Sequence, residues 1–223
     1  MIKLIIFDLG DIFYDTHLHS RLFEAEFKNF LKKYDVKRNM MEIDRLWDYL
    51  HPLASNGRIT AKEAHGIQLK HMGLAKRLLP EFSSIEYRTF SKVALKESSM
   101  PKTLRLLKKK GYRLAILSDS IVTTREVMLR LKRLGIAEFF DGVFTSSGIG
   151  YAKPDRKSYR TVMKAFKVKP FETIFVAHDK DELAGAKKLG IKSVSYLGVK
   201  FGDYYMRKFP ELLEVLAKLG QFQ

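Results

Sequence analysis

A regular alternation of short apolar runs and amphipathic runs between residues 100 and 196 is the feature that most constrains the fold. The apolar runs are rich in β-branched and aromatic residues and occupy residues 112–117, 142–145, 173–177 and 192–196, with one earlier run at residues 3–7. Helical patterns occupy residues 102–110, 123–134, 158–166, 182–189 and 209–219. Strands that alternate with helices form βαβ units, with parallel strands and helices on both faces. The sequence therefore predicts an α/β fold built on a parallel sheet.

Residues 16–98 interrupt this alternation. Apolar residues recur there at steps of three and four, which predicts helices near residues 18–34, 40–50, 60–73 and 82–94. The third of these begins with a capping-box pattern, Thr60 followed by Glu63. We find no convincing strand in this stretch. We therefore expect an all-helical insertion at residues 16–98, between two parts of one core at residues 1–15 and 99–223.

The net charge is +16, and its position matters more than its size. Residues 99–223 hold 25 basic and 12 acidic residues, a net charge of +13, and most of the basic residues lie on predicted helix faces. Solvated helix faces explain this pattern best, and attraction of anionic substrates or of nucleic acid is the sharper alternative. No nucleic-acid-binding motif accompanies the charge, so no nucleic acid is expected as a partner.

Composition excludes several other classes of protein. The chain has no Cys, which rules out a disulfide scaffold and a cysteine nucleophile. Its apolar runs are shorter than the roughly 18–20 residues that span a bilayer, and the opening run is too short for a signal peptide. We therefore expect no membrane association and a cytoplasmic location.

Polar residues follow four of the predicted strands, at the edge where open α/β sheets bind ligands. They are Asp8, Ser118, Lys153 and the cluster at residues 178–182. A carboxylate can attack an electrophile and form a covalent intermediate. A hydroxyl, a lysine and a cation held by acids can bind the negative oxygens of an anionic substrate. The spacing thus favours a small anionic substrate and covalent hydrolysis.

This ordered set resembles the motifs of the haloacid dehalogenase (HAD) superfamily of hydrolases, which are mostly phosphatases. The four segments are FDLGDIFYD at residues 7–15, LSDS at residues 117–120, GYAKPD at residues 150–155 and FVAHDKDELAGA at residues 175–186. The resemblance covers residues 1–16 and about 100–200, and it implies a Rossmann-like core with a helical cap inserted between the first two motifs.

The resemblance also implies roles for individual residues. Asp8 would be the nucleophile, Ser118 and the adjoining Asp119 would bind the transferred group, and Lys153 would neutralise charge on Asp8 and on the substrate. In the phosphatases that the chain resembles, Mg²⁺ lies between the nucleophile, the backbone carbonyl two residues later, which is Gly10 here, and an acid of the fourth motif. We therefore expect a Mg²⁺-dependent phosphatase of small phosphorylated metabolites.

Two residues depart from the family pattern. Gly10 stands where the family has its general acid, a group typically worth about 10²–10⁴ in rate. His178 stands where the family has the metal-binding acid, and imidazole is a poor ligand for Mg²⁺. Asp179 is the expected substitute ligand, and Asp181 and Glu182 remain alternatives at that point.

These departures support two further hypotheses. The first is a metal-independent 2-haloacid dehalogenase, a class in the same superfamily that also attacks with the first Asp and lacks the acid that Gly10 replaces. The second is a binding protein that keeps the fold with weakened catalysis.

Overall fold

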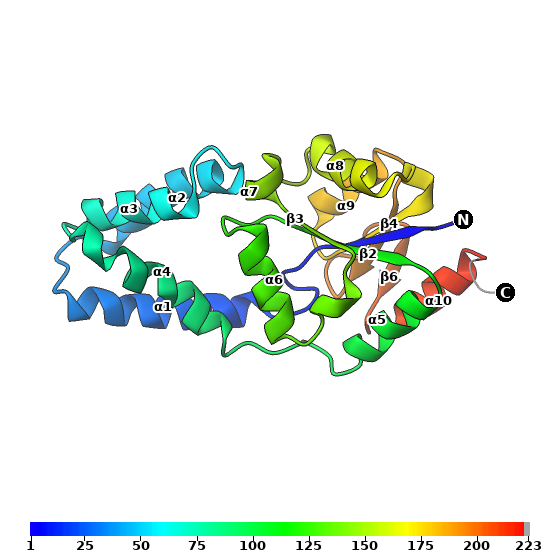
Figure 1. Ribbon diagram of the computed structural model, residues 1–223, viewed down its shortest axis with the longest axis horizontal. Coiled ribbons are helices and arrows are strands. Elements are labelled where there is room, and N and C mark those ends of the chain that lie inside the picture. Colours follow the sequence, from blue (N-terminus) through cyan, green and yellow to red (C-terminus); the bar gives the residue numbers. More distant parts are fainter. Residues whose placement is uncertain (221–223) are drawn as a thin grey trace.

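Figure 1 shows the computed structural model, in which an α/β core lies beside a lobe of four helices and residues 1–220 are described. Within those residues the core holds a six-stranded parallel sheet in the order β3-β2-β1-β4-β5-β6. The strands are β1 (Leu4–Phe7), β2 (Arg113–Ser118), β3 (Gly142–Thr145), β4 (Thr173–Ala177), β5 (Lys192–Tyr196) and β6 (Tyr204–Met206). The predicted α/β fold with a parallel sheet is confirmed, and β6 extends the sheet by one strand that the sequence pattern did not indicate.

Helices cover both faces of the sheet, as predicted. One face packs against α5 (Met100–Lys109), α6 (Thr124–Arg133) and α10 (Glu211–Lys218). The other packs against α8 (Arg156–Phe166) and α9 (Lys180–Lys187), and a short helix, α7 (Ser146–Ile149), follows β3. α9 begins at Lys180, directly after its Asp179 cap and two residues before the expected start at residue 182.

The first strand of the chain is the centre of the sheet. β1 pairs with β2 on one side and with β4 on the other, and all four of its residues are buried. The strand order runs in opposite directions from β1, which creates a crevice at the carboxyl ends of β1 and β4. The residue after β1, Asp8, therefore enters the crevice where open α/β sheets bind ligands.

The lobe consists of α1 (Thr16–Lys33), α2 (Met40–Ser55), α3 (Ala61–His71) and α4 (Leu79–Phe90). Its interior includes Phe27, Phe30 and Phe82, so the aromatic stripe of the sequence packs inside the lobe. The predicted capping box at the start of α3 is present. The fourth helix begins at Leu79, three residues before its expected start, because Pro80 fits the first turn, where no N–H donor is needed.

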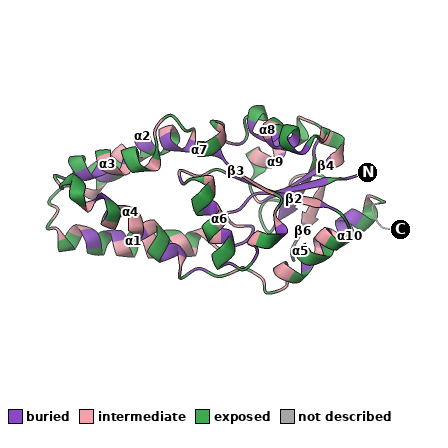
Figure 2. Ribbon diagram, viewed as in Figure 1, coloured by how far each residue is buried: buried purple, intermediate pink, exposed green. Residues whose placement is uncertain are grey.

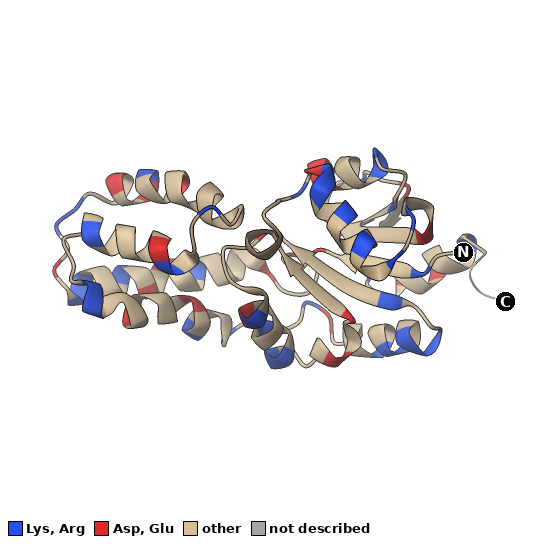
Figure 3. Ribbon diagram, turned by 45° about the horizontal axis from the view of Figure 1, so that its top comes forward, with Lys and Arg blue, Asp and Glu red and all other residues tan. Residues whose placement is uncertain are grey.

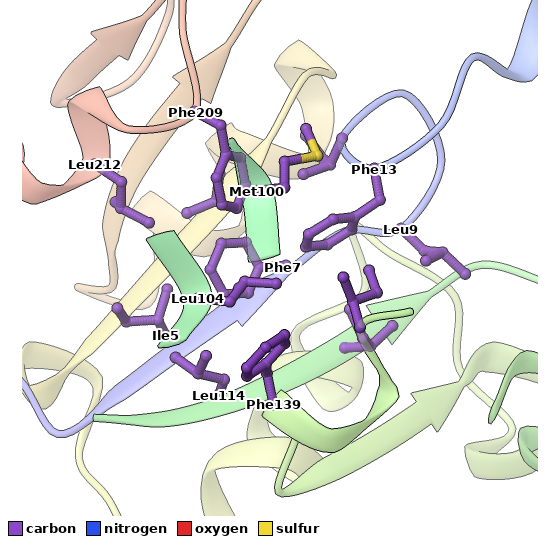
Figure 4. Packing of buried hydrophobic residues seen from close by; sticks show 14 of the residues in the cluster. Ile5, Phe7, Leu9, Phe13, Met100, Leu104, Leu114, Phe139, Phe209 and Leu212 are labelled. Atoms are coloured by element: carbon purple, nitrogen blue, oxygen red, sulfur yellow. The ribbon is translucent and has the colours of Figure 1, made fainter. Parts of the chain in front are cut away.

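The core is sealed by large apolar side chains. Figure 2 shows buried strands between helices whose outer sides are exposed. Figure 4 shows Phe7, Phe13 and Phe209 converging above β1, and the centroids of these three rings lie 5.5–5.8 Å apart. Such offset and tilted ring pairs are favourable beyond the area that they bury. They fix the segment that carries Asp8, because Phe7 and Phe13 lie on either side of it in the sequence.

Charged side chains lie mainly on the outer helices. Figure 3 shows Lys and Arg spread along helices of both the lobe and the core, which agrees with the interpretation of the positive charge as solvated helix faces. Within residues 1–220, no helix has the length and apolar character needed to span a bilayer.

Candidate active site

Asp8 and Lys153 form a buried ion pair at the carboxyl end of the sheet. The Asp8 backbone N–H donates to the carbonyl of Val176 at 2.9 Å, which continues the β1–β4 pairing and fixes the backbone. The Lys153 Nζ lies 2.5 Å from Asp8 Oδ1, and it donates to the Leu117 carbonyl at 3.0 Å. The Lys153 side chain has no exposed surface. The structure thus brings two of the predicted catalytic residues into direct contact.

Electrostatics keep this pair ionised. Burial alone would raise the pKa of Asp8, but the Lys153 ammonium and His178 outweigh it, and the pKa falls below its ordinary value. Burial alone would lower the pKa of Lys153, but the carboxylates of Asp8, Glu182 and Asp119 outweigh it and raise that pKa. Asp8 is therefore a carboxylate at neutral pH, the form that a nucleophile needs.

The loop before α8 positions Lys153. The backbone N–H of Lys153 donates to both carboxylate oxygens of Asp119, each at 3.1 Å. The neighbouring Pro154 packs against Gly185 of α9, where an added Cβ would lie 2.8 Å from the Pro154 Cβ. Gly185 therefore lets the loop approach α9 closely enough for Lys153 to reach Asp8. Asp119 supports Lys153 in this way, a role that the motif comparison did not indicate.

A cavity of about 430 Å³ opens above Asp8, between the core and the lobe. Its core wall includes Gly10, Ser118, which is the last residue of β2, and Asp119, which follows it. Its lobe wall comes from α1, α2 and α4 and includes His19, Trp47 and Glu86. This volume lies within the range of small-molecule sites.

The cluster at residues 178–182 divides between the site and the solvent. Asp179 is exposed and caps α9, since its Oδ1 accepts from the N–H groups of Asp181 and Glu182. Asp181 is exposed as well. Glu182 lies inward, with Oε1 3.1 Å from Lys153 Nζ, and its burial, with Asp8 nearby, raises its pKa to about 8. Of the acids in this cluster, Glu182 is therefore the one that faces the site.

His178 occupies the space beside the second oxygen of Asp8. Its Nδ1 lies 3.5 Å from Asp8 Oδ2, and its Nε2 lies 3.8 Å from Asp11 Oδ2. The contact with Asp8 raises the pKa of His178 and favours the imidazolium. Among residues 1–220, no group of three or more His, Asp or Glu side chains is arranged to hold a metal ion.

Two residues of the cavity wall, Glu86 of α4 and Arg130 of α6, were not singled out from the sequence. They form an ion pair across the lobe and the core, with Arg130 Nη2 2.5 Å from Glu86 Oε1. The two residues lie on different helices, and no sequence motif surrounds either of them. In the sequence each looks like an ordinary charged residue on the surface of a helix, so no signal distinguished them.

Known proteins resemble this chain over most of its length. Residues 5–196 match the family described as haloacid dehalogenase-like hydrolase. A glyceraldehyde 3-phosphate phosphatase of Pyrococcus furiosus is 31% identical, in a match that covers 97% of this chain and 94% of the relative. A 2-haloacid dehalogenase from Pseudomonas syringae pv. Tomato DC3000 has a similar structure, with a TM-score of 0.76, 22% identity and coverage of 98% of this chain and 100% of the other. A HAD phosphatase from Thermococcus onnurineus gives a TM-score of 0.70 at 21% identity, covering 96% and 98%.

Proposed function

Because the chain belongs to the haloacid dehalogenase-like hydrolase family, we propose that it is a phosphatase of small phosphorylated metabolites that acts through an aspartyl-phosphate at Asp8. The observation that carries the proposal is the ionised carboxylate of Asp8, fixed by Lys153 at the wall of a small cavity. The relative from Pyrococcus furiosus, named a glyceraldehyde 3-phosphate phosphatase, supports a substrate of this kind.

Asp8 supplies the nucleophile. Lys153 holds Oδ1, and Oδ2 attacks the phosphorus of a phosphate monoester. A bond forms between Oδ2 and phosphorus, the bond from phosphorus to the leaving oxygen breaks, and that oxygen takes up a proton. Water then attacks the phosphorus of the aspartyl-phosphate, which releases inorganic phosphate and restores the Asp8 carboxylate.

Ser118, Asp119 and Lys153 bind the transferred group in this proposal. The Ser118 hydroxyl and the adjoining backbone N–H groups donate to phosphoryl oxygens, and Lys153 offsets their negative charge. Gly10 offers no side chain for proton transfer. We assign that transfer to His178, whose imidazolium lies beside Asp8 Oδ2.

Magnesium is the cofactor that the resemblance implies, and we propose that this chain does not hold it through Asp8, Gly10 and Asp179. The Asp8 carboxylate and the Gly10 carbonyl supply oxygen donors. The third position carries the His178 imidazole, and the Asp179 carboxylate caps α9. Mg²⁺ requires nearly octahedral oxygen ligands, so this donor set does not fit it. No step above is therefore routed through the ion.

We also propose that residues 16–98 act as a cap over a core formed by residues 1–15 and 99–223. The cavity above Asp8 is lined from both sides, and its lobe wall comes from three of the four lobe helices. The cap would then select the substrate. The expected cytoplasmic location and the absence of nucleic-acid and membrane partners stay predictions.

The His178 imidazole, which lies beside Asp8 where the family has a metal-binding acid, also favours a second candidate function. This candidate is metal-independent dehalogenation of 2-haloacids by the same Asp8. Here Oδ2 would attack carbon and displace halide, and water would hydrolyse the ester. Halide release from 2-chloropropionate that is insensitive to a chelator would establish this activity, and no release would exclude it.

The deciding experiment measures turnover of p-nitrophenyl phosphate and of a panel of phosphorylated metabolites, with and without Mg²⁺. We expect turnover that Asp8→Asn abolishes. Asp44→Asn, which changes an exposed acid of the lobe, is the matched control and should leave turnover unchanged. Absence of turnover for every ester would overturn the phosphatase proposal and favour a binding protein that keeps the fold.

A further inference from the structure

One wall of the cavity above Asp8 is formed by the lobe and α6. This wall carries one positive and one negative side chain in contact with each other. Arg130 Nη2 and Glu86 Oε1 lie 2.5 Å apart, and their side chains are only 12% and 26% exposed. Both residues line the cavity above Asp8, and both also line a second cavity of about 580 Å³ between α3, α4 and α6. The pair therefore forms the partition between the two cavities.

Neighbouring groups hold this partition in place. The Arg130 guanidinium lies over the Phe90 ring, 4.8 Å from its centroid. The His19 Nε2 lies 3.8 Å from Glu86 Oε1 and 3.3 Å from the Thr89 hydroxyl, and burial lowers the pKa of His19. His19 is therefore neutral at physiological pH. The charges of Glu86 and Arg130 consequently cancel, and the wall as a whole is polar and uncharged.

We propose that this wall selects a substrate whose leaving group is uncharged and hydroxylated, and that Glu86, by pairing with Arg130, leaves a second anionic group of a substrate without a counter-charge. The inference rests on the proposed phosphatase function and names the substrate class of the same site. The cavity offers neutral hydrogen-bonding partners to such a leaving group from Ser20, His51 and Ser120.

A second anion is disfavoured for an electrostatic reason. Arg130, the guanidinium that lines this wall, is already paired, so a substrate carboxylate would have to displace Glu86 to reach it. The neutral pair otherwise offers no counter-charge, and placing an unpaired anion in a partly buried site is costly. This cost acts on specificity more than on affinity for the phosphoryl group, which binds at the other end of the cavity.

A matched pair of substrates tests this inference. sn-Glycerol 1-phosphate and 3-phospho-D-glycerate share the phosphate ester and the configuration of the central carbon, and they differ at the far carbon, which is a primary alcohol in the first and a carboxylate in the second. We expect the wild-type kcat/KM to favour sn-glycerol 1-phosphate by about tenfold or more. This ratio needs no variant, so it tests the inference even if substitutions in the wall impair folding.

Substitutions should move the ratio in opposite directions. Glu86→Gln frees Arg130 and should shift the ratio about tenfold toward phosphoglycerate. Arg130→Gln leaves Glu86 unpaired and should shift it the other way, and the double variant should lie near the wild type. Glu26→Gln, which removes a lobe ion pair with Lys92 outside the cavity wall, is the control and should leave the ratio unchanged.

Turnover of p-nitrophenyl phosphate by each variant separates the outcomes. A wild-type ratio near one, or a ratio that Glu86→Gln does not change in a variant that still hydrolyses p-nitrophenyl phosphate, overturns the inference and leaves the phosphatase proposal standing. Absence of turnover of all three esters by the wild type overturns the proposed function and this inference with it.

Discussion

Asp8 Oδ1 and Lys153 Nζ lie 2.5 Å apart, although 145 residues separate them in the sequence. The contact combines the end of the central strand with a loop that Asp119 and Gly185 hold in place. It gives the site an ionised carboxylate next to a buried cation, the pair on which the proposed chemistry depends.

Lys153→Met should impair both activity and stability. Loss of a charged group that offsets developing negative charge typically lowers kcat by about 10²–10³. Removal of one partner of a buried ion pair costs about 3–5 kcal/mol of unfolding free energy. Steady-state kinetics with p-nitrophenyl phosphate and urea unfolding measure the two effects. Lys157→Met, at an exposed lysine in the first turn of α8, is the control. Equal behaviour of the two variants would contradict the role given to Lys153.

His178→Asp should create a stronger Mg²⁺ site. The substitution replaces an imidazole by an oxygen ligand beside Asp8 Oδ2, which suits a hard cation. We expect calorimetric titration to give a Kd for Mg²⁺ at least about tenfold lower than that of the wild type, with a matching rise in Tm.

Asp179→Asn is the companion variant for this measurement. Asn is also a good N-cap, so the helix should tolerate the change, and Mg²⁺ binding should not respond to it. If Asp179→Asn instead abolished Mg²⁺ binding by the wild type, Asp179 would be a metal ligand as the sequence led us to expect.

Gly10→Ala should destabilise the protein through one contact. A Cβ at Gly10 would lie 2.8 Å from the Thr16 Cγ2, closer than packed carbon atoms approach. Overpacking of this kind typically costs about 1–3 kcal/mol. Thr16→Ser removes the methyl group and keeps the hydroxyl that donates to Asp11, so Gly10→Ala should cost less in that background. A double-mutant cycle by urea unfolding measures the coupling, and additive effects would show that the contact is unimportant. The acidic residue that the family has at this position would make the same close contact with the Thr16 methyl group.

The lobe should lose stability below about pH 6.5. Burial lowers the pKa of His65 from 6.5, and its ring stacks on Trp47 and hydrogen-bonds to Ser83. The unfolded chain therefore binds the proton more readily than the folded one. The contribution of neutral His65 to stability is complete above pH 6.5 and is lost as the pH falls toward its lowered value. His51 shifts in the same direction for the same reason.

Trp47 fluorescence reports this effect, because it is the only tryptophan of the chain and lies in the lobe. Between pH 7.5 and 5.5 the Tm of the wild type should fall, and the fall should be smaller for His65→Gln. A wild-type Tm that is constant across this range would contradict the assignment.

Much of the fold could be predicted because its signals are local. Each of the five predicted strands is a short apolar run, and each helix pattern of the core appears in the structure near its expected bounds. β6 escaped prediction because its residues include two tyrosines that are only partly buried, next to polar residues, so no apolar run marked it. Its pairing with β5 decides its conformation, and that contact is not encoded locally.

Site residues could be predicted where a motif stands at the end of a strand. They could not be predicted where several similar residues follow one another and only the folded structure decides which of them faces the site. Asp8 and Lys153 meet as expected, and Ser118 and Asp119 line the cavity. Asp179, Asp181 and Glu182 follow β4 closely, and the sequence does not show which of them faces inward. That depends on where α9 begins. Glu86 and Arg130 meet only through the packing of α4 beside α6, a relationship that no spacing in the sequence expresses.

The central place of β1 also determines when the sheet can assemble during synthesis. β1 is synthesised before its two neighbours, which begin at Arg113 and Thr173, so it remains unpaired until those segments have been made. The lobe helices contact one another within a single stretch and can form early, whereas pairings of high sequence separation form slowly. Since the entropy of loop closure grows only with the logarithm of loop length, the inserted lobe affects the order of these events more than the final stability. Asp8 is thus translated well before Lys153, and the ion pair between them can form only after the loop that carries Lys153 has been made.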